Sequence, residues 1–229
     1  MITDPPLLTI RADFPRPAKE IVEAFAGVPT GHVVDAMGGV GALDYRIKPL
    51  EIPGKVMIGV ALTCDNGPAD NLAAFGALSV AKPGDILVAA TGGYTGVAVV
   101  GDLMLGMARN RGIVGFVTDG LVRDVVGILD VGLPVYCAGV TPNSPVRNGP
   151  GTVGQPVDLG GLRIESGDLL IGDRDGVVVV PRARAAAVLE GLKAVRVAEA
   201  ALEAKVKAGL EIPHFVKGIL ESDRVRRVE

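Results

Sequence analysis

The stretch VVGDLMLGMARNRGIVGFVTDGLVRDVVGILDVGLPVYC, residues 99–137, alternates helical and strand patterns. An Asp-Gly pair at 119–120 and several further glycines separate its segments. We expect, in order, a helix over residues 102–111, an apolar strand over 113–118, a helix over 122–131 and a strand over 134–138. Because strands that alternate with helices pack as a sheet covered by those helices, the stretch predicts a mixed α/β fold.

The pattern continues on both sides of this stretch. Toward the N-terminus we expect helices over 18–27 and 29–38, a strand over 55–64, a helix over 71–81 and a strand over 86–90. Thr30 is expected to be the N-cap of the second helix, and Gly38 to end it. Toward the C-terminus we expect short strands over 162–180 and the longest helix over 181–209. A cluster of strands thus follows the alternating part, which argues against an all-α or an all-β fold.

The composition narrows the class of protein. The chain has 229 residues, 48% of them hydrophobic, which suffices for one large domain or a domain with an appended helix. Charged residues make up 21% and the net charge is −3, so we expect neither nucleic acid nor a membrane as a partner. The N-terminus lacks the basic start and apolar core of a signal peptide. Cys64 and Cys137 lie outside any CxxC pair, so a reducing, cytoplasmic location is the default.

The pair Gly101-Asp102 directly precedes the expected helix at 102–111. The first N–H groups of that helix, near Leu103 and Met104, have no acceptor within the helix and lie at the positive end of its dipole. Such a helix start binds a carboxylate or a phosphate readily. The alternative is that Asp102 only caps the helix with its own oxygen, and the spacing alone favours this alternative.

The pair Arg123-Asp124 follows the Asp-Gly turn and falls at or near the start of the next helix. The planar donors of an arginine suit a carboxylate or a developing oxyanion. One carboxylate with waters suits Mg²⁺, which keeps several waters and few protein ligands. The alternative is that Asp124 only complements the helix dipole and that Arg123 is a solvated charge. The sequence favours neither this alternative nor the functional interpretation.

Glu199 interrupts an apolar stripe of the long C-terminal helix. The stripe residues share one helix face: Val188, Leu192, Val195, Leu202 and Val206. A buried glutamate needs a basic partner, a metal or water, because an unpaired buried charge is costly. The alternatives are that this part of the helix is exposed or that Glu199 has a structural partner. The stripe could also face a neighbouring subunit.

Residues 92–128 resemble the class II pyruvate aldolase family, through the combination of the glycine-acid helix start with the later DGxxRD. That family contains the 4-hydroxy-4-methyl-2-oxoglutarate and 4-carboxy-4-hydroxy-2-oxoadipate aldolases and the proteins named regulator of ribonuclease activity A. The resemblance covers most of the chain, from PTGHVVDAMGG through Asp70-Asn71 and PGDILV to the C-terminal helix. It implies a swivelling β/β/α-type single domain over residues 1–229. It also implies a trimer or hexamer, in which 181–229 is a helical extension that packs on a neighbouring subunit.

The resemblance also implies roles for individual residues. Asp124 is expected to bind Mg²⁺ or Mn²⁺ directly, and Arg123 to bind the carbonyl and enolate of the keto acid. Asp102 is expected to help activate a metal-linked water. Glu199 of the neighbouring subunit is expected to contact the metal through water. Three residues of the helix start are expected to bind the pyruvate carboxylate: Gly101, Leu103 and Met104.

The function implied is a metal-dependent lyase that cleaves a 4-hydroxy-2-oxo acid to pyruvate through an enolate, with oxaloacetate decarboxylation as a second activity. The alternative is a protein-binding regulator of an RNA-degrading enzyme, although members with that role tend to lack the long C-terminal helix. A methyltransferase would need a methyl-donor site, and GGVG at 38–41 is too weak a signal for one. The tail LEIPHFVKGILES, residues 210–222, departs from the family pattern. The sequence therefore does not determine the chemical identity of the distal half of the substrate.

Overall fold

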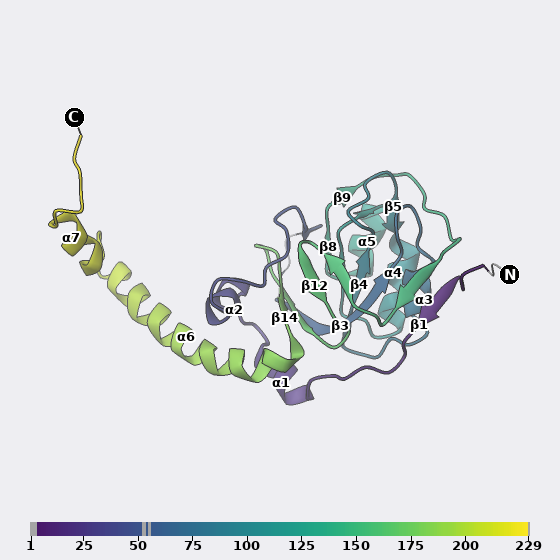
Figure 1. Ribbon diagram of the computed structural model, residues 1–229, viewed down its shortest axis with the longest axis horizontal. Coiled ribbons are helices and arrows are strands. Elements are labelled where there is room, and N and C mark those ends of the chain that lie inside the picture. Colours follow the sequence, from purple (N-terminus) through teal and green to yellow (C-terminus); the bar gives the residue numbers. More distant parts are fainter. Residues whose placement is uncertain (1–3, 52–53, 55, 229) are drawn as a thin grey trace.

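The structure, a computed structural model, describes residues 4–51, 54 and 56–228. These residues form a mixed α/β domain from which a long C-terminal helix extends (Figure 1). The main sheet has nine strands in the order β1-β10-β3-β4-β6-β8-β2, and β13 and β14 are attached beside β3. Its strands are β1 (Leu8–Ile10), β2 (Lys48–Pro49), β3 (Met57–Asp65), β4 (Asp85–Ala90), β6 (Gly115–Thr118), β8 (Val135–Cys137), β10 (Gly151–Val153), β13 (Leu169–Gly172) and β14 (Val177–Val180).

Two smaller sheets and several helices complete the described fold. The smaller sheets are the hairpin β11 (Val157–Leu159) with β12 (Leu162–Ile164), and the parallel set β5 (Ala98–Val100), β7 (Leu121–Val122) and β9 (Gly139–Val140). The helices are α1 (Lys19–Ala24), α2 (Thr30–Ala36), α3 (Leu72–Ala77), α4 (Asp102–Asn110), α5 (Val125–Val131), the 3₁₀ turn η1 (Arg182–Arg184), α6 (Ala185–Lys207) and α7 (His214–Leu220).

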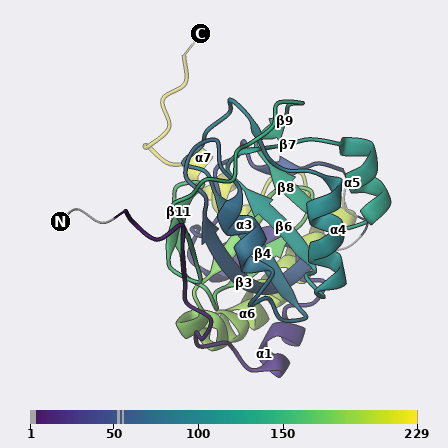
Figure 2. The same cartoon turned by 90° about the vertical axis from the view of Figure 1, so that its right-hand side faces the viewer.

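The centre of the main sheet is parallel. Strands β3, β4, β6 and β8 are parallel neighbours, and every residue of β4 is buried. A strand buried on both faces needs a nearly continuous apolar sequence, which ILVAA at 86–90 provides. Helices α3, α4 and α5 cover one face of the sheet (Figure 2), and the β11–β12 hairpin packs on the other. The predicted mixed α/β class is therefore confirmed.

The second helix of the opening stretch begins three residues later than expected. Leu121 and Val122 extend as β7 between β5 and β9, and α5 starts only at Val125. Asp124 lies between them with a left-handed backbone, at φ 60° and ψ 47°. The prediction that the helix starts at 122 was wrong, because pairing with two neighbouring strands holds this segment extended. The strand expected over 55–64 is β3, and the expected first residue, Lys55, lies outside the described residues.

Thr30 is not the N-cap of α2. The helix begins at Thr30 itself, and Pro29 precedes it as the N-cap. The Thr30 N–H donates to Asp173 Oδ2 at 2.8 Å, and the Thr30 hydroxyl donates to Asp173 Oδ1 at 2.8 Å. A carboxylate from the turn between β13 and β14 therefore accepts the hydrogen bond from the N–H at the helix start, which a local cap would otherwise accept. Gly38 follows the helix end with φ +81°, as expected of a residue that stops a helix.

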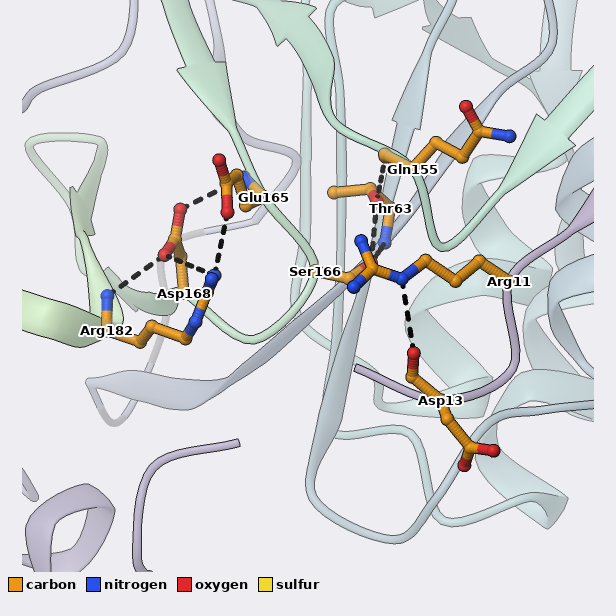
Figure 3. A network of polar contacts seen from close by, with 8 residues as sticks. All are labelled: Arg11, Asp13, Thr63, Gln155, Glu165, Ser166, Asp168 and Arg182. Atoms are coloured by element: carbon orange, nitrogen blue, oxygen red, sulfur yellow. Dashed lines mark hydrogen bonds and ion pairs between the residues drawn. The ribbon is translucent and has the colours of Figure 1, made fainter. Parts of the chain in front are cut away.

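Helix α6 is anchored at its N-terminal end only. Val188 and Leu192 are buried against the core beside α2, whereas Leu202 and Val206 are 48% and 55% exposed. Figure 3 shows the polar network at its base, in which Asp168 accepts from the Arg182 N–H at 2.9 Å and from the Glu165 N–H at 3.0 Å. The rest of α6 leads away from the domain (Figure 1). Within the described chain, no helix combines the length and apolar character needed to cross a membrane.

Candidate functional site

One pocket gathers most of the residues singled out in the sequence. It encloses about 230 Å³ where the start of α4, the end of β7, the start of α3 and the loop at 144–147 meet. Its lining residues are Asn71, Phe75, Val99, Val100, Gly101, Asp102, Leu103, Met104, Met107, Arg123, Asp124, Pro145 and Arg147. Two segments that are separate in sequence, 101–104 and 123–124, thus share one hollow.

The side chain of Asp102 does not cap α4. Gly101 is the N-cap, and Asp102 is already the first helical residue, with no side-chain capping bond. Asp102 Oδ1 instead accepts from the neighbouring Leu103 N–H at 2.7 Å. The interpretation of Asp102 as the N-cap was therefore wrong, because the extended backbone of Gly101 takes that position. The N–H of Met104 lies in the first turn, where the helix offers it no acceptor.

Two glycines make room for the two carboxylates of the pocket. A Cβ on Gly101 would lie 2.4 Å from Asp124 Oδ2, and a Cβ on Gly127 would lie 2.4 Å from Asp102 Oδ2. The carboxylate of Asp124 therefore packs on the start of α4, and that of Asp102 packs on α5. This reciprocal arrangement holds Asp102 and Asp124 at the contact between the two helices. The sequence offered one signal for Gly127, an otherwise unfavourable glycine inside an expected helix.

Arg123 is held from two sides at the edge of the pocket. Its Nε lies 3.2 Å from Asp124 Oδ2, and its Nη1 donates to Ser144 Oγ. The backbone N–H of Arg123 donates to the Val100 carbonyl at 3.1 Å, which ties the segment to β5. The Arg123 side chain is 34% exposed, so solvent reaches the guanidinium and its remaining donors can meet a ligand. A left-handed aspartate such as Asp124 is uncommon, and such backbone outliers cluster at functional sites.

Asn71 and Arg147 also line the pocket, although the sequence gave neither a role. Asn71 is 3% exposed, and its Nδ2 donates to the Val99 carbonyl at 2.9 Å. Its Oδ1 is buried and has no donor among the described residues. A buried acceptor without a donor costs about 1–3 kcal/mol. The Arg147 guanidinium lies 5.2 Å from the centre of the Phe75 ring, which forms a cation–π contact. Asp70-Asn71 was noted only as a pair that matches the family.

Glu199 does not reach this pocket within one chain. It lies exposed on the part of α6 that extends away from the domain (Figure 1). In a single chain, this part of the helix is therefore exposed, which was one of the alternatives left open by the sequence. The expected contact with a metal through water needs a second subunit, and it stays a prediction.

The donors of the pocket suit a hard divalent cation. Among the described residues, no group of three or more His, Cys, Asp or Glu side chains could hold a metal, so Asp102 and Asp124 are two carboxylates without a third. Mg²⁺ and Mn²⁺ accept one or two carboxylates together with water, whereas Zn²⁺ favours three or four protein ligands with nitrogen or sulfur. The pocket lining contains neither histidine nor cysteine. The donor set therefore fits Mg²⁺ or Mn²⁺.

A larger hollow of about 440 Å³ lies elsewhere and contains Asp44, Asp119 and Asp158. Two of these carboxylates already have partners. Asp119 accepts from the Thr91 N–H, the Thr91 hydroxyl and the Gly93 N–H. Hydrogen bonds from Arg46 lower the pKa of Asp44 to about 2. The smaller pocket also contains the start of α4, whose first N–H groups suit an anion, so we take it as the candidate functional site.

Comparisons with known proteins match most of this chain. The family model described as RraA-like, Aldolase/RraA, matches residues 30–179. A protein of Halalkalibacterium halodurans that is provisionally named 4-hydroxy-4-methyl-2-oxoglutarate aldolase is 37% identical over 174 residues, 76% of this chain and 82% of its own length.

Two solved structures share the fold. An uncharacterized protein of Pseudomonas syringae pv. tomato matches with a TM-score of 0.74 and 25% identity, over 86% of this chain and 96% of that one. The RNA-processing inhibitor RraA from Thermus thermophilis matches with a TM-score of 0.62 and 25% identity, over 67% of this chain and 93% of that one. Residues that hold the pocket, from Asn71 to Arg147, all fall inside the stretch that the family model covers.

Proposed function

Because the chain belongs to the Aldolase/RraA family, we propose that it is a divalent-metal-dependent lyase, which cleaves a 4-hydroxy-2-oxo acid of the 4-hydroxy-4-methyl-2-oxoglutarate type to pyruvate. The observation that carries the proposal is the meeting of Arg123, Asp124 and Asp102 with the start of α4 in one pocket. A helix start suits the carboxylate of a keto acid, and an arginine suits the oxygen on which charge develops.

The substrate carboxylate binds first, at the start of α4. The Met104 N–H is free in the first turn, and the Leu103 N–H is engaged by Asp102 Oδ1. A bound carboxylate displaces Asp102 from that N–H and so releases its oxygen toward the pocket. Gly101 supports this geometry, because its lack of a side chain keeps Asp124 against the helix start.

Asp102 then acts as the base, through a water, and removes the proton of the 4-hydroxyl group. The C3–C4 bond breaks, C4 becomes a carbonyl carbon, and the electron pair moves into the enolate of pyruvate. Arg123 donates to the enolate oxygen, and removal of one comparable oxyanion-hole donor from a protease costs about 2.7–4 kcal/mol. A proton delivered to C3 completes pyruvate. When bound, the divalent cation supplies further stabilisation of the oxygen charge, with Asp124 as its direct ligand.

The same enolate forms when oxaloacetate loses CO₂. No 4-hydroxyl proton has to be removed in that reaction, so it depends on Arg123 and Asp124 more than on Asp102. We therefore propose oxaloacetate decarboxylation as a second activity of the pocket.

The proposed enzyme works as a trimer or hexamer in which residues 181–229 of one subunit cover a neighbour. Two features support this assembly. The outer part of the α6 stripe is exposed, and so are Leu103 and Val126 beside the pocket, at 79% and 76%. A neighbouring α6 would cover apolar surface of this kind and bring Glu199 toward the waters of the metal.

The test measures pyruvate release from 4-hydroxy-4-methyl-2-oxoglutarate and from oxaloacetate, with Mg²⁺ or Mn²⁺ and with EDTA. Release that depends on the metal supports the proposal, and the ratio of the two rates ranks the activities. If folded, metal-loaded protein releases pyruvate from neither compound, the proposed lyase is wrong. Binding of an RNA-degrading enzyme would then be the function to test, as the likeness to the Thermus RraA structure suggests.

A further inference from the structure

The small parallel sheet β5-β7-β9 ends at the functional pocket. Strand β5 leads into Gly101 and Asp102, and β7 leads into Arg123 and Asp124. Strand β9 runs parallel to β7, so the segment that follows it, residues 141–144, leaves the sheet at the same edge. In open α/β sheets, ligands bind outside the carboxyl ends of the parallel strands. The ends of β5 and β7 have roles in the proposed chemistry, whereas the end of β9 has none so far.

Asn143 fixes the segment that follows β9. Its side-chain Nδ2 donates to the Gly96 carbonyl at 2.9 Å. Its backbone carbonyl accepts from the N–H of Ala98, the first residue of β5, at 3.0 Å. The backbone and the side chain of Asn143 together therefore hold the position of the next residue, Ser144.

Ser144 and Asp124 both accept from Arg123, but they affect its charge differently. Arg123 Nη1 donates to Ser144 Oγ, and Arg123 Nε lies 3.2 Å from Asp124 Oδ2. A neutral hydroxyl orients the guanidinium and leaves its positive charge to a ligand, whereas a carboxylate compensates part of that charge. When Asp124 binds the divalent cation, as proposed above, its negative charge is shared with that ion. Ser144 then keeps the guanidinium in place.

The orientation of Arg123 matters because it lies between two hollows. The second hollow, of about 300 Å³, is lined by Arg123, Asp124, Val125, Val140, Thr141 and Pro142. Arg123 is only partly buried, so its long side chain gains rotamer freedom when it loses an acceptor. Pro145, which follows Ser144, lines the functional pocket. The bond to Ser144 therefore holds the guanidinium on the side of the functional pocket.

We propose that Ser144, held in place by Asn143, orients Arg123 toward the enolate oxygen. Ser144 and Asn143 are positioning residues, which act through Arg123 and make no contact with the reacting atoms. The inference rests on the proposed function and deepens it, because it gives the end of β9 a role beside the ends of β5 and β7. Loss of the Ser144 hydroxyl should weaken the stabilisation of the enolate more than the binding of the keto acid itself.

Binding of oxalate tests this role without turnover, because planar oxalate resembles the enolate of pyruvate in shape and charge. Titration calorimetry of the full chain with Mg²⁺ compares the native protein, Ser144→Ala, Arg123→Ala and the double variant, which form a double-mutant cycle. Ser144→Ala alone should weaken oxalate binding about 3- to 10-fold, the usual effect of one hydrogen bond. In the Arg123→Ala background it should have no effect, because the hydroxyl has no guanidinium to orient. A merely structural role would weaken binding in both backgrounds.

Three further variants separate orientation from general damage to the loop. Ser144→Thr keeps the hydroxyl and should bind oxalate with near-native affinity. Asn143→Ala should weaken binding less than Ser144→Ala does, because the backbone bond from Ala98 remains. Ser79→Ala is the matched control, since it removes an exposed hydroxyl that donates to the Gly76 carbonyl just after α3, outside the pocket. It should leave the affinity unchanged.

Three results would overturn the positioning role: equal losses in the two backgrounds, native affinity in Ser144→Ala, or no binding of oxalate by the native protein with Mg²⁺. The pyruvate-release assay decides the proposed function separately. Coupling between Ser144 and Arg123 without pyruvate release keeps the orienting role and loses the lyase. Pyruvate release without this coupling keeps the lyase and loses the orienting role.

Discussion

Gly127→Ala is the change that tests the geometry of the pocket most directly. Its new Cβ would lie 2.4 Å from Asp102 Oδ2 and 2.7 Å from Asp102 Cβ. Rotation of the carboxylate relieves the first contact but not the second, because the backbone fixes the position of a Cβ. Helices α4 and α5 must therefore separate by about 0.3 Å to bring the second distance to 3.0 Å, and by about 0.7 Å to bring it to 3.4 Å.

Two opposing terms set the effect of this change on stability. Overpacking of this size costs roughly 1–3 kcal/mol. Replacement of glycine by alanine inside a helix stabilises the folded protein by about 0.8–1 kcal/mol. The net loss is about 0–2 kcal/mol, which lowers the melting temperature by up to about 8 °C in a chain of this size. The variant should therefore fold.

The effect on catalysis should be larger. A catalytic group displaced by about 1 Å can lose roughly 100-fold in rate. A shift of a few tenths of an ångström at Asp102 should lower kcat for cleavage of 4-hydroxy-4-methyl-2-oxoglutarate by about 10-fold or more. Oxaloacetate decarboxylation should fall less, because it needs no proton from a 4-hydroxyl. A lactate dehydrogenase-coupled assay of pyruvate measures both rates.

Gly106→Ala on α4 provides the matched control. The nearest atom to its new Cβ would be a Val131 methyl at 3.9 Å, which is an ordinary contact. This variant should be slightly more stable and equally active. If Gly127→Ala cleaves the hydroxy acid at the native rate, the role of Asp102 as the base is wrong.

The remaining predictions concern other parts of the molecule. Arg123→Ala should abolish pyruvate release with little change in melting temperature, whereas Ser144→Ala, which removes one acceptor of Arg123, should lower kcat about 3- to 10-fold; native rates in Arg123→Ala would contradict the mechanism. Asp173→Ala should lower the free energy of unfolding by about 0.5–2 kcal/mol in urea titrations, because it removes the cap of α2. Burial raises the pKa of Cys64 from 9.0 to about 12, so the stability that depends on the neutral thiol should be complete below pH 9 and decrease as the pH rises toward 12. Melting temperatures of the native protein and of Cys64→Ala across that range measure the effect, and equal slopes would contradict it.

The features that local patterns determine were predictable from the sequence. Alternating segments in 99–137 predicted helices and strands in a mixed α/β fold, and the structure confirms this class, with α4, β6, α5 and β8 in the expected order. Asp102 was singled out because it stands at a helix start whose free N–H groups suit an anion, and Arg123 because its planar donors suit a carboxylate or an oxyanion. They do line one pocket.

The features that depend on contacts distant in sequence were not predictable. Asp173 caps α2 from 143 residues away, so the local candidate Thr30 was wrong. The left-handed backbone of Asp124 was not predictable either. It directly follows β7, which lies between two strands, and the sequence has no glycine at this position to indicate such a conformation. Arg147 lies in a loop-rich region, and hydrogen bonds of its neighbours Val146, Asn148 and Gly149 to residues 69–71 hold its loop beside the pocket.

The one-sided anchoring of α6 has a consequence for how the protein responds to its own concentration. The outer turns of the helix have little of the chain's core to rest on, and a free helix of about 12–15 residues is only marginally stable in water. Contact with another copy would stabilise these turns, and by mass action their order would increase with protein concentration. Dilution would then loosen the outer turns first, while the sheet, anchored separately, stays folded. Amide hydrogen exchange in residues 195–207 would report this as protection that rises with concentration, ahead of any change in the exchange of β4.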